Sequence, residues 1–114
     1  MGVITMRIIS GMFFIAAVIG VSGCATVTPL TDGGATVRQI TPAQAAHCTF
    51  VRTVSYTNTL AGPGKSPGLV HQDGENGIRN AVALAGGNAY VNTLADADWF
   101  WGHVNYTAES YRCP

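Results

Sequence analysis

The chain has 114 residues, with six basic and six acidic side chains and a formal net charge of zero. This balance excludes the strongly basic surface that binding to nucleic acid requires. A chain of this length has room for one small domain.

Residues 1–23 have the composition of a secretory signal. Arg7 is the only charged residue among them, and an apolar run follows at residues 8–20. That run is 13 residues long, whereas a helix that spans a bilayer needs about 20. The pattern predicts a cleaved signal, and an uncleaved transmembrane anchor is the alternative.

The tetrapeptide Val21-Ser22-Gly23-Cys24 closes this segment and is typical of a lipobox. We expect cleavage between Gly23 and Cys24 and acylation of Cys24, for example by palmitate. More than one acyl chain on this cysteine would make the membrane anchor stable. Residue 25 is Ala, and lipoproteins without Asp at that place are generally sorted to the outer membrane. The predicted location is the outer membrane, with the domain facing the periplasm and the membrane as a partner through the lipid.

Residues 24–36 are small, polar and rich in turn formers, which predicts a flexible tether before a domain over residues 37–114. Residues 37–40 predict a short strand. Thr41 is expected to cap a brief helical turn, with Pro42 at its first position.

Two cysteines remain after the lipidated one, Cys48 and Cys113. An exported protein enters an oxidising compartment, so a disulfide between them is the simplest prediction. It would close a loop of about 65 residues and contribute roughly 4 kcal/mol in the chain-entropy model. A redox-active or metal-binding pair is the alternative, although the chain has no CxxC motif.

Residues 48–57 predict a strand, because β-branched and aromatic residues dominate them. Alternate residues are expected to share one face, namely Cys48, Phe50, Arg52, Val54 and Tyr56. A loop rich in glycine and proline is expected over residues 61–68.

The clearest helix is predicted over residues 73–87, with Asp73 as N-cap and Glu75 near the positive helix end. Gly86 and Gly87 are expected to end this helix. Its apolar stripe follows helical spacing and consists of Ile78, Ala81, Val82 and Ala85.

Two further strands are predicted, over residues 88–94 and 102–113. In the first, one side is expected to carry Ala89, Val91 and Thr93. In the second, one side is expected to carry Val104, Tyr106, Ala108 and Ser110. The order β-α-β-β predicts a small α+β domain of two layers, with one helix on a three- to four-stranded sheet.

No cofactor or metal site is predicted. His47, His71 and His103 lack the spacing of metal ligands. The segment Gly64-Lys65-Ser66 lacks the first glycine of a phosphate loop. The pair Asp96 and Asp98 is expected to lie in a hydrophilic turn, with cation binding as the alternative.

The tripeptide Trp99-Phe100-Trp101 is the candidate interaction site. Three adjacent large aromatic residues cannot all point the same way on a strand, and the flanking Asp98 and Gly102 predict a turn. Two interpretations remain open. Either two of the rings complete a small core, or an exposed ring contacts a protein, a glycan or a lipid headgroup.

Three features together resemble a family of small Gram-negative outer-membrane lipoproteins that contain a domain of unknown function and are related to the Rcs-pathway sensor lipoprotein. They are the lipobox, the stretch from Arg79 to Ala89 (RNAVALAGGNA) and the closing stretch from Ala108 to Cys113 (AESYRC). The likeness covers roughly residues 35–113. It implies a disulfide-stapled α+β domain displayed in the periplasm.

The leading functional hypothesis is a non-enzymatic lipoprotein that presents this domain for envelope interaction or stress sensing, with an envelope protein as a possible partner. A cell-wall or small-ligand binding module is the alternative. An envelope hydrolase or redox enzyme is a third hypothesis, for which the chain has no nucleophile-elbow or CxxC motif.

Overall fold

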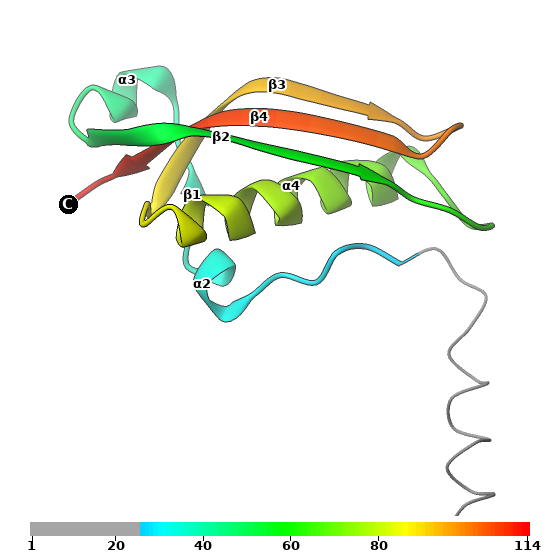
Figure 1. Cartoon of the computed structure of the whole chain (residues 1–114). Coiled ribbons are helices and arrows are strands. Elements are labelled where there is room, and N and C mark those ends of the chain that lie inside the picture. The colour runs from blue at the N-terminus through cyan, green and yellow to red at the C-terminus, as the bar shows by residue number, and fades with distance from the viewer. Residues whose placement is uncertain (1–25) are drawn as a thin grey trace, which may run out of the picture.

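The computed structural model describes residues 26–114, and Figure 1 shows their arrangement. The elements in chain order are α2 (Asp32–Ala35), β1 (Arg38–Gln39), α3 (Pro42–Ala45), β2 (Thr49–Thr59), α4 (Pro67–Leu84), β3 (Ala89–Asp98) and β4 (His103–Arg112). The strands form one sheet in the order β1-β3-β4-β2. β1 runs parallel to β3, and the other neighbours are antiparallel.

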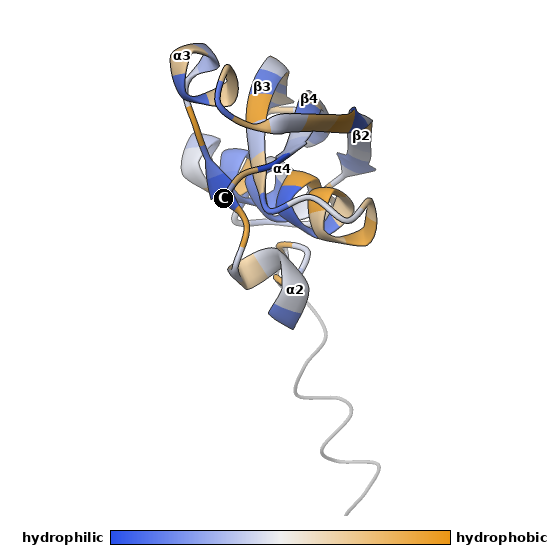
Figure 2. Cartoon of the chain, turned by 90° about the vertical axis from the view of Figure 1, so that its left-hand side faces the viewer, coloured by the Kyte–Doolittle hydropathy of each residue, from blue (hydrophilic) through white to orange (hydrophobic). Residues whose placement is uncertain are grey.

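The sheet and α4 form two layers, which confirms the predicted α+β fold (Figure 1). An end-on view shows α3 above the sheet and α2 below α4 (Figure 2). The main core lies between α4 and the sheet, where Val70, Ile78 and Val82 of the helix meet the sheet face. That face carries Val104, Tyr106, Ala108 and Ser110 of β4, as the alternation predicts, and all four are buried.

The helix α4 begins earlier than the sequence predicts. Ser66 is its N-cap, with the side-chain oxygen accepting a 3.2 Å hydrogen bond from the Leu69 N–H, and Pro67 occupies the first turn. The prediction of Asp73 as N-cap is therefore wrong, and residues 67–68 belong to the helix and not to the loop. The Ser66-Pro67 pair is the same signal as Thr41-Pro42, which does begin α3 through a capping box with Gln44.

Two glycines in α4 allow tyrosine rings of the sheet to approach the helix backbone closely. A Cβ atom on Gly74 would lie closer than 3.0 Å to the ring of Tyr106, and one on Gly77 would meet the ring of Tyr56 in the same way. Glycine at these places costs helix propensity, which the close packing of the aromatic rings offsets.

A β-bulge changes which residues of β2 face the helix. The register shifts between Phe50 and Arg52 in the pairing of β2 with β4. One extra residue at the bulge reverses the side-chain alternation. Phe50 therefore lies on the face of its partner Tyr111, with the two ring centroids 5.7 Å apart, and not on the face of Val54. The prediction that Phe50 shares a face with Val54 and Tyr56 is therefore wrong.

The opposite sheet face has a small second core under α3. It contains Ile40, Ala45, Ala89 and Cys113, with Val91 packed against them. Ala89 and Val91 share this face, as predicted. Thr93 interrupts the pattern, because the register of β3 against β4 shifts between Asn92 and Leu94.

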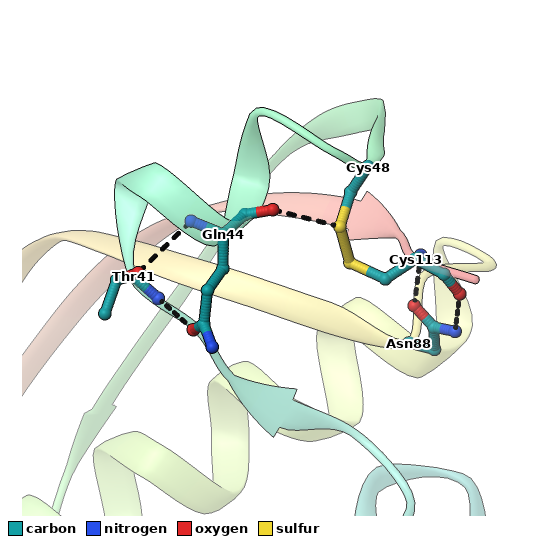
Figure 3. Close-up of a disulfide and its surroundings, with 5 residues drawn as sticks. All are labelled: Thr41, Gln44, Cys48, Asn88 and Cys113. Carbon is teal, nitrogen blue, oxygen red and sulfur yellow. Dashed lines mark hydrogen bonds between the residues drawn. A yellow bond between two sulfur atoms is a disulfide. The ribbon is translucent and has the colours of Figure 1, made fainter.

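The disulfide between Cys48 and Cys113 is present, with a Cα–Cα separation of 4.4 Å (Figure 3). It ties the residue before β2 to the residue after β4. The Asn88 side chain holds the same end of the chain by donating to the Cys113 carbonyl at 2.9 Å and accepting from the Cys113 N–H at 2.8 Å. Cys48 Sγ lies 3.5 Å from the Gln44 carbonyl oxygen, a contact without a proton because this sulfur belongs to the disulfide.

The segment before β1 packs against the domain, although residues 24–36 are predicted to be a tether. The Thr28 N–H donates to Asp73, Asn76 donates to the Thr28 carbonyl, and Asn80 donates to the Pro29 carbonyl. Sequence alone does not reveal these partners, because they lie about 50 residues further along the chain. The predicted signal peptide and the cleavage and lipidation site at Gly23 and Cys24 lie outside the described residues.

Candidate functional site

The aromatic turn, which we define as Trp99, Phe100 and Trp101, connects β3 to β4. The Gly102 N–H donates to the Asp98 carbonyl at 2.8 Å and closes the turn, and the Asp98 carboxylate accepts from the Phe100 N–H at 3.0 Å. Gly102 has a φ of 77°, which glycine adopts at little cost. The prediction that Asp96 and Asp98 lie in a hydrophilic turn is wrong, because both belong to β3, and the turn that follows them consists of the aromatic residues and Gly102.

All three rings of the aromatic turn are exposed. The exposed fractions are 49% for Trp99, 61% for Phe100 and 64% for Trp101. Phe100 meets both neighbours edge to face, with ring centroids 5.9 Å from Trp99 and 5.1 Å from Trp101. The interpretation in which two rings complete the core is therefore wrong, whereas contact of an exposed ring with a partner stays a prediction.

The loop after β2 clamps the aromatic turn. The Leu60 N–H donates to the Gly102 carbonyl at 2.8 Å, and the Leu60 side chain is only 5% exposed. A Cβ on Gly102 would collide with the Leu60 carbonyl oxygen and would lie 3.1 Å from the Lys65 side chain. The turn is therefore a supported structure, and its rings project from a fixed base.

A second set of polar groups lies under the sheet around Asp73, which is fully buried. Its carboxylate accepts hydrogen bonds from the Thr28 N–H at 2.8 Å, the Tyr56 hydroxyl at 3.0 Å and the Asn58 amide at 3.2 Å. Burial is the main cause that raises the pKa of Tyr56, and Asp73 adds to it. This arrangement satisfies a buried carboxylate and attaches the N-terminal segment, so we assign it a structural role.

Glu75 faces β3 and does not complement the helix end as the sequence predicts. Its carboxylate accepts from the Tyr90 hydroxyl and, at 3.0 Å, from the Asn92 amide. Burial, followed by the hydrogen bond to Glu75, raises the pKa of Tyr90 above its ordinary value. A groove of about 450 Å³ opens beside this pair, lined also by Arg38 and Arg79.

The three histidines, which are predicted to be solvated or packed, lie in separate parts of the domain. His71 Nδ1 lies 2.6 Å from the Tyr106 hydroxyl, and His103 Nδ1 lies 3.4 Å from the Thr59 hydroxyl. His47 lies on the wall of a cavity of about 210 Å³ beside the disulfide. Across residues 26–114, no three His, Cys, Asp or Glu side chains converge in a way that could hold a metal ion.

Sequence reasoning missed Leu60 as the clamp of the aromatic turn and Asp73 as the attachment point of the N-terminal segment. The clamp leaves no local signal, because it joins two loops about 40 residues apart. Gly74 and Gly77 do leave one, because glycines three residues apart inside a helix pattern indicate close approach by another element.

No protein-family model matches the chain, and no curated protein or solved structure is detectably similar to it. In the part of the chain that the structure describes, no helix has the length and apolar character needed to cross a membrane.

Proposed function

We propose that this protein is a lipid-anchored bacterial envelope protein that acts by contact through its aromatic turn. The lipobox ending in Cys24 supports the anchor, and Ala25 supports transport to the outer membrane. The disulfide supports an oxidising compartment such as the periplasm. A stress-sensing role belongs to the same proposal, because a sensor also works by contact.

The observation that carries the proposal is the exposure of three large rings on a supported turn. Soluble domains bury most tryptophan side chains, and exposed clusters of aromatic residues mark surfaces that meet another phase or molecule. The clamp by Leu60 and Gly102 limits the entropy that the rings lose on contact, which favours binding. No catalytic role is assigned to any residue.

The first experiment is the intact mass of the protein purified from its native membranes, before and after reduction. We expect a mass for residues 24–114 plus acyl chains, and a gain of about two daltons on reduction of the one disulfide. A Cys24→Ala variant should lack acyl chains and leave the membrane fraction. A Cys48→Ser/Cys113→Ser variant is the matched control, because it should keep the acyl chains and lose only the mass gain.

An unprocessed chain without acyl groups would overturn the anchor and with it the proposed location. A chain that is acylated but has free thiols in its native membranes would leave the anchor intact. In that case the argument for an oxidising compartment would fail.

The groove beside Glu75 and Arg79 favours a second candidate function, the binding of a small polar ligand from the envelope. It presents one carboxylate and two guanidinium groups next to the Tyr90 hydroxyl. Arg79 already donates to the Val37 and Ala35 carbonyls, so Arg38 is the cation on which we expect a ligand to act. Titration with soluble cell-wall muropeptides, followed by NMR, should shift the signals of these residues, and an Arg38→Gln variant should abolish the shifts.

A further inference from the structure

We propose that the aromatic turn is a second membrane contact, seated in the interfacial layer of the bilayer that holds the lipid on Cys24. This inference rests on the proposed lipid anchor. It identifies the partner of the turn as a lipid surface and sets the orientation of the domain relative to that surface.

The N-terminal segment shows from which end of the domain the anchor leaves. Thr28 bonds to Asp73 and Asn76, whereas Thr31 bonds to Asn80 further along α4. The segment therefore runs in the same direction as α4. Followed backward from Thr28, the chain heads toward the start of α4, and Figure 1 shows the described chain beginning at that side.

The aromatic turn lies at the same end of the domain. Ser66 caps α4, and the loop before it holds the turn through the Leu60–Gly102 hydrogen bond. Figure 1 shows the β3–β4 turn, the loop after β2 and the start of α4 together at one end. α3 lies at the other end (Figure 1), and the disulfide lies beside it (Figure 3). The turn and the beginning of the described chain thus lie at the same end of the domain.

The length of chain between Thr28 and Cys24 matches the distance from Tyr106 to the aromatic turn. Thr28 and Tyr106 meet the same turn of α4, because Thr28 bonds to Asp73 and the Tyr106 ring lies against Gly74. Cys24 lies four residue steps before Thr28, which allows a reach of about 13 Å. Gly102 lies four residue steps before Tyr106 along extended chain, which is also about 13 Å. The lipid attachment point can therefore reach the level of the aromatic turn.

The chemistry of the turn suits a lipid interface. Tryptophan combines a large apolar ring with an N–H donor, and it is enriched where hydrocarbon gives way to headgroups. The charged side chains near the turn are of both signs, namely Lys65, Asp96 and Asp98. The surface therefore does not require anionic lipid. Because the acyl chains already hold the protein at the bilayer, even a weak affinity of the turn would keep it inserted.

The test uses the intact lipidated protein in vesicles of phosphatidylethanolamine and phosphatidylglycerol. The chain contains only two tryptophans, Trp99 and Trp101, so its intrinsic tryptophan fluorescence reports on this turn alone. With lipids brominated near the headgroup, we expect strong quenching of the emission, because interfacial tryptophan lies at the level of the headgroups. Aqueous iodide should quench less in vesicles than with the same protein in detergent.

A matched control moves the reporter to the other end of α4. Leu84 is 90% exposed and lies at the end of the helix remote from the turn. A Trp99→Tyr/Trp101→Tyr/Leu84→Trp variant should show little quenching by the brominated lipid and full quenching by iodide. Its oxidised mass and circular dichroism report whether the fold is retained.

Vesicle flotation separates the two proposals. If the protein floats with the vesicles but Trp99 and Trp101 respond to iodide and not to brominated lipid, the membrane contact is overturned and the anchor stands. If the purified chain carries no acyl groups, the anchor itself fails. A photo-crosslinker at position 101 that captures an envelope protein and no lipid in native membranes would also overturn the inference and assign the turn to a protein partner.

Discussion

The carboxylate of Asp73 accepts a 2.8 Å hydrogen bond from the backbone N–H of Thr28, 45 residues earlier in the chain. This bond joins the segment that follows the proposed lipid anchor to the buried face of α4. It also fixes the direction in which the segment leaves the domain. A residue that the sequence marks only as a helix cap therefore sets how the domain is presented.

Replacing Asp73 with Asn is expected to destabilise the domain by about 2–4 kcal/mol, because the buried donors of Thr28, Tyr56 and Asn58 lose a charged acceptor. Urea denaturation of the oxidised protein measures the loss, and faster hydrogen exchange of the Thr28 amide locates it. Asp96→Asn, on an exposed residue, should change stability by less than about 0.5 kcal/mol. Equal stability of the two variants would contradict the role of Asp73.

Alanine at either helix glycine is expected to destabilise the domain by about 1–3 kcal/mol, although alanine favours helix formation. At Gly74 the new methyl group would collide with the Tyr106 ring, and at Gly77 with the Tyr56 ring. Gly68→Ala is the matched control, because a Cβ there has no neighbour within 4 Å. It should stabilise α4 by up to about 1 kcal/mol. Differential scanning calorimetry would show shifts of opposite sign.

Substitution of Gly102 by Ala is expected to cost about 2 kcal/mol or more, because the residue has a positive φ and its Cβ would strike the Leu60 carbonyl. Gly64 also has a positive φ, of 86°, but it has open space around it. Gly64→Ala should therefore cost only the backbone strain of a non-glycine residue at positive φ, about 1 kcal/mol. The tryptophan emission should shift in the first variant and stay unchanged in the second.

Removal of the disulfide by Cys48→Ala/Cys113→Ala is expected to cost about 4 kcal/mol, since the bond closes a loop of 65 residues. The reduced wild-type protein should show the same loss in urea. A variant as stable as the oxidised protein would mean that the adjacent strands β2 and β4 hold this end without the covalent bond.

Alkaline pH should weaken the fold through its tyrosines. Burial is the first cause that raises the pKa of all four tyrosines, at positions 56, 90, 106 and 111, above 10.0. The folded state therefore binds these protons more tightly than the unfolded state. The stability this provides is fully present below pH 10 and is lost as the pH rises through the folded-state pKa values.

Urea midpoints between about pH 8 and pH 11.5 measure this effect, with tyrosinate absorbance followed in parallel. We expect a flat profile up to about pH 9.5 and a steep fall above it. In denaturant the absorbance should rise near pH 10. A midpoint that does not change across this range would contradict the raised pKa values.

Local patterns predicted much of the fold. The order β-α-β-β, the alternation of β4, the capping of α3 and the stop at Gly86, with its φ of 89°, depend on neighbouring residues and were all predicted from them. The pairing of Cys48 with Cys113 was predicted by counting cysteines in an oxidising compartment. The lipobox is likewise local, and it remains the basis for the anchor.

The tertiary structure decided what depends on distant partners. The bulge after Phe50 is a matter of pairing with β4, and it reversed a face that alternation alone assigned. Asp73 looked like a cap because its partner Thr28 lies 45 residues away. The exposure of Trp99 to Trp101 follows from the length of the β3–β4 hairpin and from the clamp at Leu60, because burial is a property of the packed chain and not of the residues that carry it.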